Sequence, residues 1–367
     1  MLRRIERSTR RVRWAIERRL PGRLRARINH LRRWKHLLAN GHYDVARYAR
    51  HSGIWGGSDR QIVLRALITM NYHRLEKGLA LSTPRPGFGR QPTHELQRDL
   101  TAYVQEFGVD DTVRVALDAL RAYLDFHDAA GAPNDDLRQF VDELAMSLSV
   151  AEATEEERRG GVRPTTREDI LSAGKLDLRE FFRHRYSIRH FSAEPVDLAL
   201  IEDAVRMAQK TPSVCNRQSS KVHVYTTAPE RSRVLAHQNG NRGFGEQIDK
   251  LLLVTTELGN FVSIGERNQC WVDGGMFAAS LVYALHSLGL GTCCLNCSND
   301  MQTDESLRVA AGIPPSEAII MMIAVGHLPD RLNVAQSPRK RIDEVLVTRA
   351  PGPGHLVIAT PVEAGGG

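Results

Sequence analysis

Long hydrophobic runs are missing from this sequence. Although 42% of its 367 residues are hydrophobic, no apolar run approaches the roughly 20 residues that a bilayer-spanning helix needs. The first residues also lack the compact apolar segment of a secretory signal peptide. We therefore expect a cytoplasmic protein with enough apolar residues for a sizeable core.

Cysteine is scarce, and its number is odd. The five cysteines are Cys215, Cys270, Cys293, Cys294 and Cys297. So few thiols do not suggest a disulfide framework, which favours a reducing compartment. One C-x-x-C pair, Cys294 and Cys297, has no second pair to complete a zinc site. We interpret these thiols as small apolar strand residues and expect no bound metal.

Several catalytic signatures are absent as well. The fourteen histidines include no H-x-x-x-H pair, and neither G-x-S-x-G nor G-x-x-x-x-G-K-[ST] occurs. These absences argue against a helix-borne zinc site, a nucleophile elbow and a P-loop. A G-x-G-x-x-G pattern is also missing, so the sequence does not predict a dinucleotide held in a Rossmann fold.

Acidic residues are nearly absent from the first 35 positions. This segment holds fourteen Lys and Arg but only Glu6 and Glu17, a net charge of +12, so the rest carries −5 of the total of +7. Apolar residues recur at helical spacing, with a break at Pro21 and Gly22, which predicts two short basic amphipathic helices within residues 1–38. Three roles stay open: docking on the anionic inner face of a membrane, packing on the body as a helical hairpin, and, least expected, binding nucleic acid.

Beyond residue 38, the pattern divides the chain into further parts. Residues 39–150 are expected to be helical, and residues 151–175 to form a linker. Residues 176–350 alternate between strands and helices, whereas the Gly- and Pro-rich residues 351–367 are expected to be disordered. Helices of the first part are expected at 61–73, 96–107, 111–127 and 135–150.

A basic cluster and a polar turn flank one amphipathic helix in residues 183–218. The cluster reads RHRYSIRHF, in which Arg185 and Arg189 bracket Ser187. Two guanidinium groups and a hydroxyl can bind the oxygens of a phosphate. The turn reads TPSVCNRQ, in which the amides of Asn216 and Gln218 can bind the edge of a flat heterocycle. Taken alone, the two patterns also suit a surface cation cluster and ordinary turn chemistry.

The order of four such blocks resembles the nitroreductase family of FMN-dependent oxidoreductases. RHRYSIRHF and TPSVCNRQ are similar to its phosphate-binding and P-S-x-x-N-x-Q blocks. The third block, DGGMFAASLVYALHSLGLGTCCLN, is similar to the family's long central helix and the strand that follows it. The fourth block, IAVGHLP followed by SPRKRIDEVL, is similar to its closing strand and basic tail. The resemblance covers roughly residues 177–347. One departure is that Ser219 and Ser220 stand where the family usually has Pro-Trp.

The resemblance implies a fold, a cofactor and an assembly. The fold is α+β, a mixed, mainly antiparallel sheet wrapped by helices, here preceded by an all-helical region. A homodimer is expected, with FMN at its two-fold interface and NAD(P)H as co-substrate. The amphipathic helix between the basic cluster and the polar turn has roughly a dozen residues and is therefore about 18 Å long, close to the length of FMN. The implied FMN contacts are Arg185, Ser187, Arg189, Pro212, Ser213, Asn216, Gln218, Cys293, Cys294, Arg339 and Arg341.

The expected reaction moves hydride from NAD(P)H through FMN to a small organic acceptor in ping-pong turnover. Alternatives are a specialised enzyme that acts on a biosynthetic intermediate or on its own flavin, and a non-catalytic flavin-binding scaffold at a membrane surface. Candidate substrate contacts are Phe244 and the charged residues of a helix end that Gly78 is expected to cap. These charged residues, His73, Arg74, Glu76 and Lys77, also suit a salt-bridged helix terminus.

Overall fold

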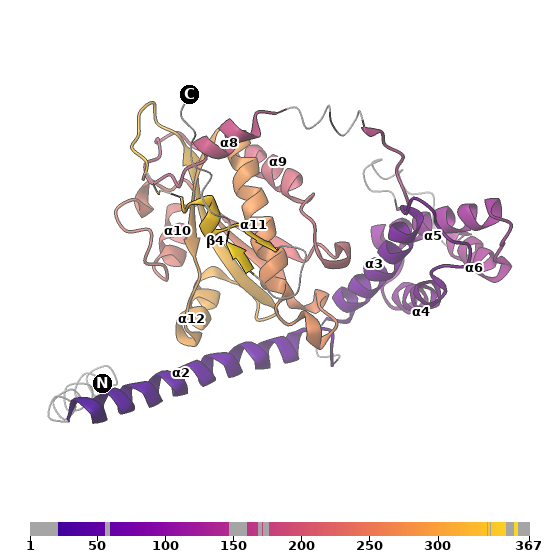
Figure 1. The fold of residues 1–367 in the computed structure, drawn as a ribbon, viewed down its shortest axis with the longest axis horizontal. Coiled ribbons are helices and arrows are strands. Elements are labelled where there is room, and N and C mark those ends of the chain that lie inside the picture. The colour runs from indigo at the N-terminus through magenta and orange to yellow at the C-terminus, as the bar shows by residue number, and fades with distance from the viewer. Residues whose placement is uncertain are drawn as a thin grey trace.

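An all-helical part and a sheet-containing part make up the protein (Figure 1). The computed structural model describes residues 21–55, 59–146, 160–167, 171, 176–335, 337, 339–349 and 356–358. Its combination of helices with an antiparallel sheet confirms the α+β fold class. Within the described ranges, no helix combines the length and apolarity that crossing a bilayer requires.

Four antiparallel strands form the main sheet in the order β1-β2-β4-β3. They are β1 (Ser220–Tyr225), β2 (Lys250–Glu257), β3 (Leu290–Asn296) and β4 (Glu317–His327). Strand β2 is buried along its whole length, as its continuous apolar run predicts for a strand covered on both faces. Strand β3 lies at one edge, where Ser187 forms a parallel bridge to Thr292.

Helices cover both faces of this sheet. One face packs against α9 (Leu198–Ala208) and α11 (Gln269–Ser287), and the other against α10 (Ala228–Leu235) and α12 (Met301–Ala311). Helix α9 begins where the Asp197 side chain accepts a hydrogen bond from the Ala199 N–H, 3.0 Å away, as an N-cap aspartate does. Helix α8 (Leu178–His184) lies beside the end of α11.

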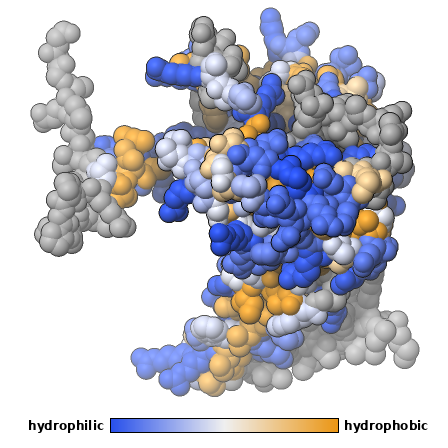
Figure 2. All heavy atoms as spheres, turned by 90° about the vertical axis from the view of Figure 1, so that its right-hand side faces the viewer, coloured by the Kyte–Doolittle hydropathy of each residue, from blue (hydrophilic) through white to orange (hydrophobic). Residues whose placement is uncertain are grey.

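The helical part has a core of its own. It consists of α3 (Arg60–Leu79), α4 (Arg90–Phe107), α5 (Asp111–Ala129) and α6 (Asp135–Met146). Their apolar stripes meet in one cluster around residues such as Leu75, Leu96 and Leu120. Seen from this end, the surface of the molecule is mostly hydrophilic (Figure 2).

Helix α2 (Gly22–His51) departs from the predicted pattern. It begins after Pro21, as the sequence indicated, but it is a single helix of 30 residues and not a short one. The boundary expected after residue 38 therefore falls inside a continuous helix. Residues 1–20, where the first basic helix was predicted, lie outside the described residues, as does most of the linker at 151–175.

Two smaller expectations are corrected. Helix α3 continues through Gly78 and is capped by Ala80. Gly78 provides space for the Phe88 ring and does not end the helix, since a Cβ at Gly78 would lie 2.1 Å from Phe88 Cε2. Within the tail expected to be disordered, Leu356–Ile358 forms strand β6 and pairs with β5 (Val347–Arg349).

The two parts of the chain meet where α2 ends and α3 begins. The Gly53 N–H donates a hydrogen bond to the Phe261 carbonyl at 2.9 Å. Ile62 of α3 packs so closely on Gly259 that a Cβ there would lie 2.9 Å from its side chain. Helix α3 also contacts the turn at Val214–Asn216, so the helical part touches one half of the candidate site.

Candidate functional site

The predicted phosphate-binding residues lie on an extended segment at the edge of the sheet. The Ile188 N–H donates a hydrogen bond to the Thr292 carbonyl at 2.8 Å, which attaches the segment to β3. Alternation along extended backbone turns Ile188 into the core and places Arg185, Ser187 and Arg189 on the other side. We call these three residues the cationic cluster.

Close packing fixes the position of the cationic cluster. Gly291 permits the approach of its backbone, since a Cβ at Gly291 would lie 3.1 Å from Ile188 Cγ2. On the preceding side, α8 packs on α11 through Phe181 and His286, whose ring centroids are 4.6 Å apart. Arg185 follows as the C-cap residue of α8, so its backbone is held from both directions.

Charge distinguishes the cationic cluster from its neighbours. Within the described residues, no carboxylate lies within ion-pair distance of Arg185 or Arg189. The adjacent Arg183, in contrast, is paired with Glu180. Burial raises the pKa of the Cys293 thiol on β3, and the charge of Arg189 opposes that rise, which places the cluster beside the strand expected to face a ring.

The polar turn has a strained backbone. Cys215, Asn216 and Gln218 have φ values of 49°, 53° and 47°, in the left-handed region that costs a non-glycine residue about 1–2 kcal/mol. The Gln218 N–H donates to Ser213 Oγ at 3.0 Å, and the Val214 N–H donates to Asp273 Oδ2 at 3.1 Å. Strain that surrounding contacts maintain is typical of functional sites.

Arg217 holds this turn in place, although the sequence analysis did not single it out. Its buried guanidinium forms an ion pair with Glu266 and donates to the Asn260 carbonyl at 2.7 Å. It also lies over the Phe261 ring, 5.6 Å from its centroid. The sequence offers little signal for this role, because Glu266 lies 49 residues away along the chain.

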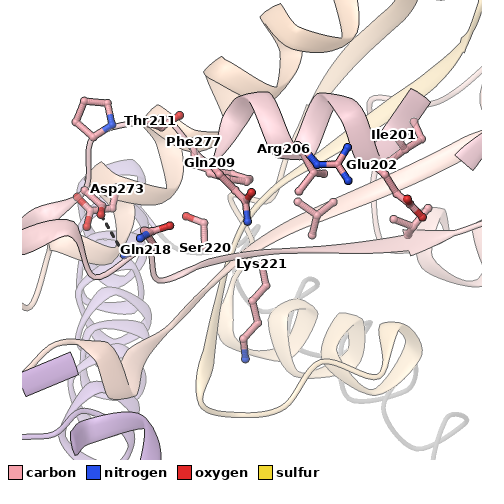
Figure 3. A pocket seen from close by; sticks show the side chains of 15 residues that line it. Ile201, Glu202, Arg206, Gln209, Thr211, Gln218, Ser220, Lys221, Asp273 and Phe277 are labelled. Atoms are coloured by element: carbon pink, nitrogen blue, oxygen red, sulfur yellow. Dashed lines mark hydrogen bonds between the residues drawn. The ribbon is translucent and has the colours of Figure 1, made fainter. Parts of the chain in front are cut away.

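A cavity of about 530 Å³ opens beside the polar turn. It lies between α9, β1 and α11, and includes the predicted residues Pro212, Ser213 and Gln218. Gln209 and Arg206 approach it from α9, whereas Lys221 points to the opposite side of β1 (Figure 3). Ser220, which replaces the Trp of the family pattern, lines this cavity.

The structure does not bring all predicted contacts together within one chain. The cationic cluster precedes α9 and the polar turn follows it, with the 11 residues of this helix between them. Cys293 and Cys294 lie on β3 near the cationic cluster, the first buried and the second exposed. Arg339 is exposed, and Arg341 donates two hydrogen bonds of 3.1 Å to the Asp343 carboxylate.

The candidate substrate residues lie elsewhere. His73 Nδ1 forms a hydrogen bond of 3.0 Å with Glu76 on α3, and Glu76 also accepts a hydrogen bond from the Gly161 N–H. Arg74 pairs with Glu95, and Lys77 is exposed on the same helix. Phe244 is buried in the core against Phe191, so its ring is not available to a substrate and that expectation is wrong.

A buried polar cluster beneath β1 was also missed by the sequence analysis. Glu317 of β4 accepts hydrogen bonds from Lys221 at 2.9 Å, His223 at 2.7 Å and Thr255 at 2.6 Å. Burial by itself would raise the pKa of Glu317, but these hydrogen bonds outweigh it and lower the pKa to about 2. The cluster ties β1, which directly follows the polar turn, to β2 and β4.

Comparison with known proteins confirms the resemblance for the sheet-containing part. The Nitroreductase family model matches residues 182–257 and 263–327. A search of curated proteins finds no significant match.

Solved structures similar to this chain cover somewhat less than half of it. A Nitroreductase Family Protein from Streptococcus pneumoniae is 18% identical and covers 47% of this chain and 100% of its own, with a TM-score of 0.40. An FMN-dependent nitroreductase from Clostridium difficile is 18% identical over 43% of this chain and 91% of its own, with a TM-score of 0.37. A protein from Desulfovibrio desulfuricans solved in complex with FMN is 20% identical over 48% and 99%, with a TM-score of 0.42.

Proposed function

We propose that the domain matching the Nitroreductase family binds FMN and is an oxidoreductase. In this proposal, NAD(P)H reduces the bound flavin and a small organic acceptor reoxidises it, in ping-pong turnover. The observation that carries the proposal is the cationic cluster: two arginines without carboxylate partners among the described residues, flanking a serine on a fixed edge segment. Two guanidinium groups that have no carboxylate partner among the described residues, carried on a backbone fixed in this way, suit a phosphate.

The residues fit the phosphate end of FMN. Arg185 and Arg189 would each donate hydrogen bonds to phosphate oxygens, and Ser187 would add a hydroxyl between them. Arg339 and Arg341 would provide further cations from the carboxyl-terminal segment. For Arg341 this requires its ion pair with Asp343 to rearrange.

The remaining contacts would position the ring. When bound, FMN supplies the group that accepts and donates hydride, so the protein has to bind, orient and shield it. Backbone groups of Cys293 and Cys294 on the edge strand β3 would face the ring. A backbone N–H donor there would stabilise negative charge on the reduced ring. The polar turn, with Pro212, Ser213, Asn216 and Gln218, would contact the ring edge or the ribityl chain.

Two chains would be needed to complete this site. The polar turn and the cationic cluster lie at opposite ends of α9, so we propose that the turn of one chain completes the site of another. Helix α11 supports this arrangement because its outer side exposes three large apolar residues, Trp271, Val272 and Met276. Contiguous exposed apolar side chains on a helix mark an interaction surface.

The experiment that tests the proposal measures flavin content and flavin reduction. Full-length protein, purified and supplied with FMN, should show bound-flavin absorbance that bleaches under anaerobic conditions when NADH or NADPH is added. Colour should return when a quinone or nitroaromatic acceptor is mixed in. Protein that binds FMN but is not reduced by either nucleotide would exclude the oxidoreductase and leave a flavin-binding scaffold. Protein that binds no FMN would refute the proposal as a whole.

A further inference from the structure

The first half of helix α2 extends away from the rest of the protein. The helix has 30 residues and none of them is buried, and at 1.5 Å per residue it is about 45 Å long. Its amino-terminal half projects beyond α12, with no other labelled element beside it (Figure 1). Packing on the body therefore does not explain why this half carries large apolar side chains.

The side of α2 that faces the body is identified by its contacts. Asn40 Oδ1 accepts a hydrogen bond from the Met301 N–H at 2.6 Å. Tyr43 donates to Asp304 Oδ2 at 2.7 Å, and Arg47 pairs with the same carboxylate at 3.2 Å. Because positions three, four and seven residues apart share one side of a helix, these three residues define the side that is attached to α12.

The apolar stripe lies on the opposite side. Leu38 and Val45 are each two residues away from a body-contacting position, which corresponds to a turn of about 200°. Leu24 and Leu31 continue the same stripe at intervals of seven residues. The exposed fractions of Leu24, Leu31, Leu38 and Val45 are 45%, 68%, 65% and 65%. The stripe therefore points into solvent, which excludes, for these residues, the helical hairpin packed on the body.

The charge on this half of the helix has one sign. Residues 21–43 contain no Asp or Glu. The cations of this segment are Arg23, Arg25, Arg27, Arg32, Arg33 and Lys35. Trp34, 51% exposed, lies at the border of the stripe. An apolar stripe bordered by Arg, Lys and Trp is typical of helices that lie in the interface of an anionic membrane.

We propose that the exposed face of α2 binds an anionic membrane surface, with the leucine stripe in the acyl boundary and the cations that border it, Arg27 and Lys35, on the lipid headgroups. A second copy of the helix fits less well, because Arg27 and Lys35 would lie beside a seam that offers no acidic partner. Nucleic acid would engage the cations but would leave the leucines in water. This inference is independent of flavin chemistry.

The test uses full-length protein and sucrose-loaded vesicles of phosphatidylcholine, with or without one quarter phosphatidylserine. We expect the protein to sediment with the anionic vesicles at low salt, to sediment less at high salt, and to ignore the neutral vesicles. The variant Leu31→Ser with Leu38→Ser should bind at least tenfold more weakly, since each buried leucine contributes strongly. The variant Arg27→Gln with Lys35→Gln removes the two cations that border the stripe and should bind about tenfold more weakly, as two headgroup contacts disappear.

A matched control removes apolar side chains elsewhere. Leu81→Ser with Met146→Ser alters two residues that are 63% and 80% exposed and should leave vesicle binding unchanged. The proposal fails if wild-type protein ignores anionic vesicles, or if the leucine variant binds them as well as wild type. It also fails if the leucine variant instead halves the mass in solution, which would assign the stripe to a second copy. DNA duplex binding that the leucine variant retains, without vesicle binding, would assign the helix to nucleic acid.

Discussion

At the scale of single residues, Arg217 has the largest influence on the shape of the polar turn. Its guanidinium is buried and contacts three separate pieces of chain, at Val214, Asn260 and Glu266. Because the adjoining residues adopt a left-handed backbone, the turn needs an anchor that outweighs its local strain. A buried ion pair with extra hydrogen bonds is able to do this.

We predict that Arg217→Met destabilises the protein by about 3–5 kcal/mol, because the substitution removes the buried guanidinium and leaves the partly buried Glu266 carboxylate without its partner. The double variant Arg217→Met with Glu266→Gln should recover part of this loss, since the uncompensated charge is then absent. Urea denaturation of both variants measures the two free energies of unfolding. A double variant less stable than the single variant would show that the ion pair is not what holds the turn.

Sequence analysis at this scale identified ligand candidates better than anchors. The cationic cluster could be singled out because R-x-S-x-R places three side chains that suit a phosphate on one side of extended backbone. Arg217 could not, because its partners lie about 45 residues further along the chain. Phe244 was misjudged for a related reason: its ring packs on Phe191, which is distant in sequence.

At the scale of elements, Glu317 determines how β1 joins the sheet. Its carboxylate contacts Lys221 and His223 on β1 and Thr255 on β2. A single buried carboxylate therefore crosslinks three strands. A shift of β1 by one residue would remove these contacts and reverse the faces of the strand.

The lowered pKa of Glu317 predicts acid-dependent stability. A pKa of about 2 in the folded protein, compared with an ordinary value of 4.5, means that the unfolded chain binds the proton more tightly. This contribution is fully present above about pH 4.5 and is lost as the pH falls towards 2. Glu317→Gln should cost about 3 kcal/mol at pH 7.

Urea denaturation of wild type and Glu317→Gln between pH 7 and the acid limit of the folded state measures this effect. The difference in unfolding free energy between the two proteins should shrink steadily below pH 4.5. Glu305→Gln serves as the control, because Glu305 lies at the surface of α12. A difference that stays constant across this range would show that Glu317 has an ordinary pKa.

Most elements followed from periodicity, and the exceptions have local causes. The helices expected at 96–107 and 111–127 correspond to α4 (Arg90–Phe107) and α5 (Asp111–Ala129), whose last and first residues, respectively, agree with the expectation. The length of α2 was misjudged because a boundary was placed after residue 38, whereas the helix continues through Gly41 to His51. Gly78 was taken for a helix end, although its missing side chain accommodates Phe88.

At the scale of the whole molecule, the outer side of α11 is the strongest indication of a second chain. Trp271, Val272 and Met276 are 46%, 50% and 41% exposed, and Gly275 among them would allow close approach. The helix is apolar on all sides, which is typical of a helix buried all round. We therefore predict a homodimer whose interface exceeds about 2,000 Å².

Light scattering at micromolar concentration measures the mass directly. Wild-type protein should be a dimer, and Val272→Asp with Met276→Asp should be a monomer with FMN affinity lowered at least tenfold, because the polar turn of the partner is lost. Val309→Asp, at an 86% exposed position on α12, should stay dimeric. A wild-type monomer that retains FMN would refute both the dimer and the shared site.

The most direct test of the central claim measures FMN affinity after removal of the cationic cluster. Arg185→Ala with Arg189→Ala should weaken FMN binding at least about a hundredfold in a fluorescence titration of flavin-free protein, since hydrogen bonds to charged groups contribute roughly 1.5–3 kcal/mol each. Arg183→Ala removes a neighbouring cation that is already paired with Glu180, and it should leave the affinity unchanged. If the double variant binds FMN as tightly as wild type, or if Arg183→Ala weakens binding equally, the cluster is not the phosphate site.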